Sequence, residues 1–298
     1  MSRAVILAEP GSGSTTFVAL LYAALVRTAV EREEEFRFSV APESVAVLTE
    51  MYAGLMSGEF PGTPGPPEIA AIRMTLAFPQ RSRHRVWPGK RTDFSDVPKV
   101  ECRWVRARFE EIEASLRGTN ASADPAASLI DCSIPIFLLS AAGFEPGRTS
   151  GPAGEASLDD SVVRVLQGLA RPRGVTRRSS GEVLRPIVVF TQLDRSSAGL
   201  LHHFGLKEPL DDNQLNQDRR RLSSAFLGKC IPKTAEFCGS AGSAVGAPEV
   251  FFSFLQTESG EGGGARIQLH TRADHSREVV GAVQQFQALI SYFGEVSA

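Results

Sequence analysis

Short apolar runs alternate along the chain with longer amphipathic stretches. The runs at residues 4–7, 134–142 and 186–190 are typical of buried strands. Residues 15–30 follow the first run closely and contain neither glycine nor proline, which predicts a helix. The same patterns predict further strands at residues 36–40, 70–78, 92–95, 249–255 and 267–269, and further helices at residues 44–56, 104–116, 161–169, 215–227 and 276–293.

Helices that alternate with short buried strands indicate an α/β fold, because parallel strands need crossover helices that cover both faces of the sheet. We therefore expect a mostly parallel sheet with helices on both faces and a ligand at the carboxyl ends of its strands. The 298 residues show no internal repeat, so one domain over residues 1–298 is expected. Its long loop insertions are expected at about residues 58–67, 79–91, 118–128, 143–158 and 171–182.

A glycine-rich turn, AEPGSGST, joins the first strand to the first helix. In the phosphate-binding pattern G-x-x-x-x-G-K-[ST], glycines turn backbone N–H groups toward phosphates, lysine bridges the terminal phosphates and the hydroxyl holds Mg²⁺. Gly13 and Thr15 match this pattern, whereas Ala8 and Ser14 replace its first glycine and its lysine. The strand and helix on either side favour a phosphate loop over a purely structural turn. Its nucleotide-binding residues are predicted to be Gly11, Ser12, Gly13, Ser14, Thr15 and Thr16.

Ser14 in place of lysine removes a charge-assisted hydrogen bond to phosphate. Such a bond contributes on the order of 1.5–3 kcal/mol, or roughly ten- to a hundredfold in affinity. Phosphoryl transfer loses more, because charge stabilisation supplies most of the catalysis at these sites. The glycine backbone and the Thr15 hydroxyl remain. We therefore expect weak nucleotide binding and no fast hydrolysis.

Three later segments carry further candidate residues. TQLD places Thr191, Gln192 and Asp194 at the end of the clearest predicted strand. DVPK, residues 96–99, follows another predicted strand, and GEFPGT places Thr63 in a loop before two strands. For Asp194 the alternative is a helix cap, and for Thr63 it is a turn residue.

Together these segments resemble the P-loop GTPases of the translation-factor-related class. More narrowly, they are similar to the bacterial double-GTPase families of multi-component conflict and signalling systems. The TT-x-x-x-x-LY start of the helix in those families is matched by residues 15–22. Their G-x-[FW]-P-x-x-T segment is comparable with residues 58–63, which have one residue fewer after the proline.

The resemblance implies a three-layer P-loop NTPase (Ras-like GTPase) fold that binds GTP or GDP with Mg²⁺. It assigns guanine recognition to Thr191, Gln192 and Asp194, where Gln192 replaces the lysine of [NT]-K-x-D. It assigns Mg²⁺ to Thr15, Thr63 and Asp96. Because the family's lysines are absent, nucleotide and Mg²⁺ binding are expected to be weakened or lost.

Lys99 stands where the D-x-x-G pattern of these GTPases has its glycine. We hypothesise that its flexible ammonium group swings toward the phosphates and partly replaces the charge missing at Ser14. The alternative is an exposed lysine in a loop.

Composition narrows the class of protein further. A formal net charge of −2 gives no basic field, so nucleic acid is not an expected partner. The four cysteines lack C-x-x-C spacing, so we expect free, partly buried thiols in a reducing cytosol rather than a zinc site. The apolar stretch at residues 17–26 is too short to cross a bilayer, and no signal-peptide pattern precedes it. A cytoplasmic protein without membrane contact is expected.

With no residue predicted to be catalytic, we expect a pseudo-GTPase that acts mainly as a regulatory or scaffolding subunit of a bacterial multi-protein conflict or signalling system. Its expected partners are other protein subunits, a second GTPase-like protein among them. One alternative is an active guanine-nucleotide switch with slow or partner-assisted hydrolysis. The other is an unrelated α/β enzyme that binds a phosphorylated small molecule.

Overall fold

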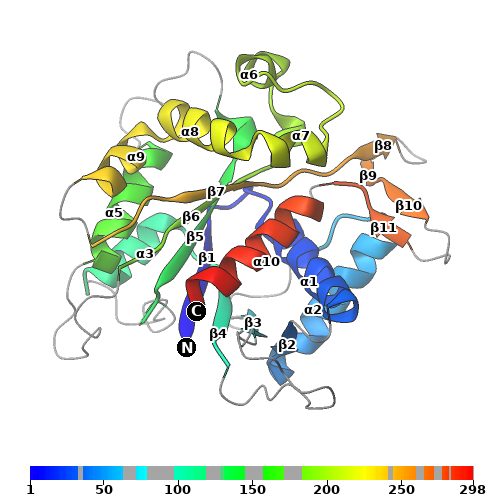
Figure 1. Ribbon diagram of the computed structural model, residues 1–298, viewed down its shortest axis with the longest axis horizontal. Helices are drawn as coiled ribbons and strands as arrows, with labels where there is room; N and C mark the ends of the chain where they lie inside the picture. The colour runs from blue at the N-terminus through cyan, green and yellow to red at the C-terminus, as the bar shows by residue number, and fades with distance from the viewer. Residues whose placement is uncertain are drawn as a thin grey trace, which may run out of the picture.

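A seven-stranded sheet forms the centre of the molecule (Figure 1). The computed structural model describes residues 1–32, 36–62, 72–78, 97–118, 129, 131–144, 157–170, 183–240, 244–259, 265–271, 277–281 and 283–297. The strand order is β2-β3-β4-β1-β5-β6-β7. These strands are β1 (Ser2–Ala8), β2 (Arg37–Val40), β3 (Ile72–Ala77), β4 (Lys99–Val105), β5 (Ile134–Ser140), β6 (Ile187–Thr191) and β7 (Glu249–Phe252). Neighbours from β4 to β7 pair parallel, and β3 pairs antiparallel with both β2 and β4.

Helices cover both faces of the sheet, which gives three layers (Figure 1). One face carries α1 (Ser14–Glu31), α2 (Pro42–Met56) and α10 (Val283–Ser297). The other carries α3 (Phe109–Leu116), α5 (Leu158–Ala170), α6 (Ala198–His203), α7 (Asp212–Gln217), α8 (Arg219–Cys230) and α9 (Pro232–Gly239). Alternate β1 side chains serve the two cores: Ala4 and Ile6 face α1, and Val5 and Leu7 face α3 and α5. The predicted α/β fold with a mostly parallel, doubly covered sheet is confirmed.

Small elements complete the chain. Two 3₁₀ turns, η2 (Ala141–Gly143) and η3 (Leu193–Arg195), follow β5 and β6. Two antiparallel pairs, β8 (Thr257–Ser259) with β9 (Ala265–Ile267) and β10 (Leu269–Thr271) with β11 (Arg277–Val279), lie beyond β7 in the sequence. Gly58 contacts this region, since its carbonyl accepts the Ile267 N–H at 2.8 Å.

Three predicted elements differ from the structure. The helix predicted over residues 104–116 is wrong at its start, because β4 continues to Val105 and α3 begins at Phe109. Trp104 and Val105 are both buried, in the cores on opposite faces of the sheet, as alternating strand residues are. Residues 276–293 likewise divide into β11 and α10, and residues 215–227 into parts of α7 and α8.

Several predicted segments lie outside the described residues. These include the strand at residues 92–95 and the loops at residues 79–91 and 171–182. The predicted loops at residues 58–67, 118–128 and 143–158 are described only at their ends.

Helix α1 is longer than the apolar stretch in its sequence. Its 18 residues have a mean hydropathy of 1.2, enough by length and composition to cross a membrane. Core helices of soluble proteins meet the same criterion, and Phe17, Val18, Leu21 and Leu25 of α1 are buried against the sheet and its neighbours. The helix is therefore weak evidence of a membrane span.

All four cysteines are buried and free, as the sequence predicts for unpaired thiols. Burial raises the pKa of Cys102 and of Cys230 to about 12, and that of Cys238 to about 11. Because the thiolate is the reactive form, these three side chains are poor nucleophiles and metal ligands near neutral pH.

Candidate functional site

The carboxyl ends of the parallel strands meet at one edge of the sheet, and the glycine-rich loop lies there. The strands that follow β1 in the chain, β2 to β4, lie on one side of it, whereas β5, β6 and β7 lie on the other. This reversal makes the gap between the ends of β1 and β5 the topological switch point, where open α/β sheets bind ligands. Ala8 and Ser140 are the last residues of these two strands.

The loop after β1 has the backbone geometry of an anion site. Gly11 and Gly13 have φ angles of 82° and 75°, in the left-handed region that favours glycine. Gly13 precedes α1 and offers it no side-chain cap, so the first-turn N–H groups remain available to a ligand. Ser14 and Thr15 open this turn and are partly exposed. Backbone N–H groups at a helix N-terminus are suited to phosphate, whichever side chain stands at the lysine position.

Thr191 holds the glycine loop from the end of β6. Its buried hydroxyl donates a hydrogen bond to the Ser12 carbonyl and lies 3.3 Å from the Leu139 carbonyl oxygen. The same side chain therefore joins the loop to the ends of two central strands. A buried threonine with both contacts fixes the loop before any ligand arrives.

Gln192 contacts the loop directly. Its φ of 54° is left-handed, which is uncommon for a residue with a side chain. Its Oε1 accepts a hydrogen bond from the Ser140 hydroxyl at 2.6 Å. Its Cγ and Nε2 lie 3.4 Å from the point where a Cβ on Gly13 would stand. Gln192 thus packs on the loop as a neutral amide. In the GTPases that this sequence resembles, the corresponding residue is a lysine.

Asp194 lines a pocket of about 150 Å³ beside the loop. Its Oδ1 accepts the Leu255 N–H at 3.2 Å, and burial raises the pKa of the carboxyl group. The helix-cap alternative fails for the next helix, because Ser197 caps α6 by accepting the Leu200 N–H at 3.2 Å. The pocket is also lined by Gly13, Thr16, Phe17, Leu20, Phe60, Thr191, Gln192, Arg195, Ser253, Phe254 and Leu255. A cavity of roughly this size holds a small ring such as benzene.

Phe60 and Arg195 form one wall of this pocket. The Arg195 guanidinium carbon lies 5.5 Å from the centre of the Phe60 ring. Phe60 belongs to the GEFPGT segment, so that segment does reach the candidate site, although Thr63 itself lies outside the described residues. A guanidinium over a ring is a weak attraction that orders both side chains.

Glu9 connects the glycine loop to α3. Its Oε1 accepts the N–H of Phe109, the first residue of α3, at 2.7 Å. A carboxylate at a helix N-terminus satisfies a free N–H group and complements the helix dipole. Burial is the largest effect on this carboxyl group and raises its pKa. The loop and the segment before α3 are therefore held together.

Lys99 lies at the opposite edge of the sheet from the loop. It is the first residue of β4, paired with Ala77, while Val100 pairs with Ser2 at the start of β1. The seven residues of β1, roughly 20 Å of strand, separate this edge from the glycine loop. The hypothesis that Lys99 replaces the charge missing at Ser14 is therefore wrong.

The segment that does reach the carboxyl edge beside β1 is residues 106–108. Leu7 pairs with Val105, so Arg106 continues β4 at the level of Ala8. The Arg106 guanidinium carbon lies 5.8 Å from the centre of the Trp104 ring, which belongs to the core on the α1 face. This part of the edge thus carries two arginines, Arg106 and Arg108, next to the Glu9 carboxylate that accepts the Phe109 N–H.

Only one of the three residues predicted to hold Mg²⁺ is among the described residues. Thr15 is in place at the start of α1, but Thr63 and Asp96 lie outside the described residues. Within the described ranges there is no group of three or more His, Cys, Asp or Glu side chains that could hold a metal ion.

Four residues at this edge escaped prediction from the sequence: Glu9, Arg106, Ser140 and Ser253. Ser140 ends β5 and Ser253 follows β7, and the apolar runs of these two buried strands are visible in the sequence. The positions of Arg106 and of the Glu9 contact are set by where β4 ends, and the sequence analysis placed a helix there, over residues 104–116.

Comparisons with known proteins yield little. No protein-family model matches the chain, and no curated protein matches it. Among solved structures it is similar to the S. cerevisiae Ski7 GTPase-like domain, bound to GDP and inorganic phosphate, with 9% identity and a TM-score of 0.29. The match covers 84% of this chain and 42% of that one, so the chain spans less than half the length of that structure. We base no functional conclusion on this similarity.

Proposed function

We propose that this chain is a P-loop GTPase-like protein whose degenerate site binds a guanine nucleotide weakly and does not hydrolyse it efficiently. The observation that carries the proposal is the fixed glycine loop at the switch point of the sheet, held by Thr191 and Gln192 beside the Asp194 pocket. Ser14 and Gln192, both without charge, stand where the resembling GTPases have lysine.

Binding would rest on backbone groups and a few side chains. The uncapped N–H groups of α1 would donate hydrogen bonds to the phosphate oxygens, and the Thr15 hydroxyl would lie beside them. Asp194 would accept N–H groups of the base, since its carboxylate lines the pocket. Arg106, at the carboxyl edge on the α1 face, would supply positive charge that a lysine supplies elsewhere.

The arginines after β4 support nucleotide binding without Mg²⁺. A guanidinium forms charge-assisted hydrogen bonds to phosphate and neutralises part of its charge, which is also the contribution of a metal ion. Because charge stabilisation dominates phosphoryl transfer, a site without the lysine of the phosphate loop is expected to bind without efficient hydrolysis.

A protein that holds nucleotide without turnover would act through its partners. We infer a regulatory or scaffolding subunit of a bacterial multi-protein conflict or signalling system, with other protein subunits, and a second GTPase-like protein among them, as partners. The support is that lysine is lost from two separate loops while the loop geometry and Thr191 contacts are kept. The retained Thr15 and Asp194 favour one second candidate, an active switch whose missing charge comes from a partner.

Calorimetric titration with GDP, GTP and ATP, each with and without Mg²⁺, tests the proposal. We expect guanine-selective binding in the micromolar range or weaker, little changed by EDTA and reduced at least tenfold by Asp194→Ala. Lys207→Ala, an exposed substitution away from the pocket, is the matched control.

Two other outcomes of this titration would count against the proposal. Absence of binding at millimolar nucleotide would overturn the proposal. Strict dependence on Mg²⁺ together with multiple-turnover hydrolysis would favour the active switch.

A further inference from the structure

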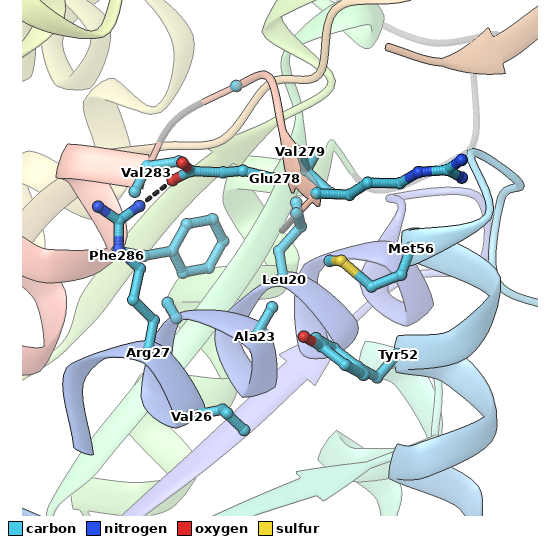
Figure 2. Close-up of a pocket in the computed structure, with 13 residues that line it drawn as sticks. Leu20, Ala23, Val26, Arg27, Tyr52, Met56, Glu278, Val279, Val283 and Phe286 are labelled. Atoms are coloured by element: carbon cyan, nitrogen blue, oxygen red, sulfur yellow. Dashed lines mark hydrogen bonds and ion pairs between the residues drawn. The ribbon is translucent and has the colours of Figure 1, made fainter. Parts of the chain in front are cut away.

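A second pocket, with a volume of about 200 Å³, lies between α1 and α2 and is completed by β11 and α10 (Figure 2). Its walls are mostly apolar. They comprise Leu20, Ala23, Ala24, Val26, Met56, Val279, Val283 and Phe286. The alanines leave room that larger residues on α1 would fill. Leu20 lines this pocket and the Asp194 pocket as well, so any test has to tell the two apart.

The polar groups of this pocket lie at its rim. The Arg27 guanidinium pairs with Glu278, as Figure 2 shows, and with Glu31 at 2.7 Å. The Tyr52 hydroxyl points toward α1 in the same view. Arg277 also lines the pocket and is exposed, and its guanidinium has no ion-pair or hydrogen-bond partner among the described residues.

One cation at the rim is placed to meet an anion. Arg27 is shared between the Glu278 and Glu31 carboxylates, whereas the guanidinium of Arg277 has no carboxylate partner among the described residues. An arginine beside an apolar cavity is suited to a carboxylate, because its planar N–H groups match the two oxygens.

The volume limits the size of the ligand. An apolar cavity of about 150 Å³ binds benzene, and drug-sized ligands need pockets of about 300–1,000 Å³. A pocket of about 200 Å³ therefore holds one ring or a short alkyl chain. We propose that it binds a small carboxylic acid, with the apolar body between α1 and α2 and the carboxylate at Arg277. This inference does not depend on nucleotide binding.

Titration with 3-phenylpropanoate, followed by NMR or calorimetry, tests the proposal, and 3-phenylpropan-1-ol serves as the uncharged probe. We expect saturable binding of the acid and roughly twofold to fivefold weaker binding of the alcohol, as for an exposed ion pair. Arg277→Gln should lower the affinity for the acid to that for the alcohol. This exposed substitution leaves the core untouched, so folding is not at issue.

Ala23→Leu fills the pocket and should weaken both probes at least tenfold. Leucine is a strong helix former, so α1 keeps its helix propensity. Ala46→Leu, exposed on α2 and away from the pocket, is the matched control and should bind like the wild type. Asp194→Ala should also leave both probes unaffected, because it alters the other pocket. Equal affinity for acid and alcohol, unchanged binding in Ala23→Leu, or no saturable binding would overturn the proposal.

Discussion

Gln192 and Ser140 show how neutral side chains hold the glycine loop. Gln192 accepts a hydrogen bond from the Ser140 hydroxyl and lies against Gly13, so the group that contacts the loop is an uncharged amide. Its left-handed φ persists only if its surroundings favour it, and strain of this kind clusters at functional sites. The contact therefore fixes the position of the loop without adding a charge beside it.

The first prediction concerns this pair. Gln192→Ala and Ser140→Ala should each destabilise the protein by about 1 kcal/mol, because a side-chain hydrogen bond contributes about 0.5–1.5 kcal/mol. The double variant should lose less than the sum, since both changes remove the same bond. Chemical denaturation of the four proteins measures this coupling. Strictly additive losses would show that the bond contributes nothing.

The second prediction concerns Arg106. Arg106→Ala should weaken GDP binding roughly tenfold, because a hydrogen bond to a charged group contributes about 1.5–3 kcal/mol. Arg117→Ala, at the far end of α3, should leave binding unchanged. Fluorescence titration with labelled GDP in EDTA compares the two variants. Equal GDP affinities of the two variants would show that Arg106 does not contribute to nucleotide binding.

At the scale of elements, the contacts that shape the site join segments far apart in the sequence. Glu9 of the glycine loop caps α3, 100 residues later, and Asp212 of α7 accepts the Gln284 N–H of α10 at 2.7 Å. Local patterns predicted β1, α1 and β6 well, since each is a buried strand or glycine-free helix. They missed β4, where Trp104 and Val105 continue into the amphipathic pattern of α3.

The third prediction concerns the contact between α7 and α10. Burial raises the pKa of Asp212 to about 6, above its ordinary value of 3.8. The folded state then holds the proton more tightly than the unfolded state, so stability falls as pH rises from about 4 to about 6. The Asp212→Asn variant has no ionisable group at this position, so its stability should not show this pH dependence.

Thermal denaturation of wild type and Asp212→Asn between pH 3.5 and 7 checks the sign. Other carboxyl groups titrate alike in both proteins and cancel in the difference. The wild type should lose stability relative to the variant across this range. A constant difference, or one of opposite sign, would contradict the assigned burial of the carboxylate.

At the scale of the whole molecule, topology decides which segments can meet at the site. The parallel register of β1 and β4 places Lys99 at the edge away from the loop and Arg106 at the edge beside it. Residue spacing alone cannot reveal this, because it does not say in which direction a strand runs. Thr191 and Gln192 contact the loop and Asp194 lines the pocket beside it, because they end or follow β6, a strand that the sequence reveals. Their role in guanine recognition stays a prediction.

The central claim is that the loop is an intact phosphate site that lacks its lysine, and Ser14→Lys tests it most directly. Restoring the charge should raise affinity for GDP roughly ten- to a hundredfold, because a charge-assisted hydrogen bond contributes about 1.5–3 kcal/mol. Isothermal titration of wild type and Ser14→Lys, with Lys207→Ala as a control, measures this change. An affinity for GDP that stays unchanged in a folded Ser14→Lys variant would contradict the account.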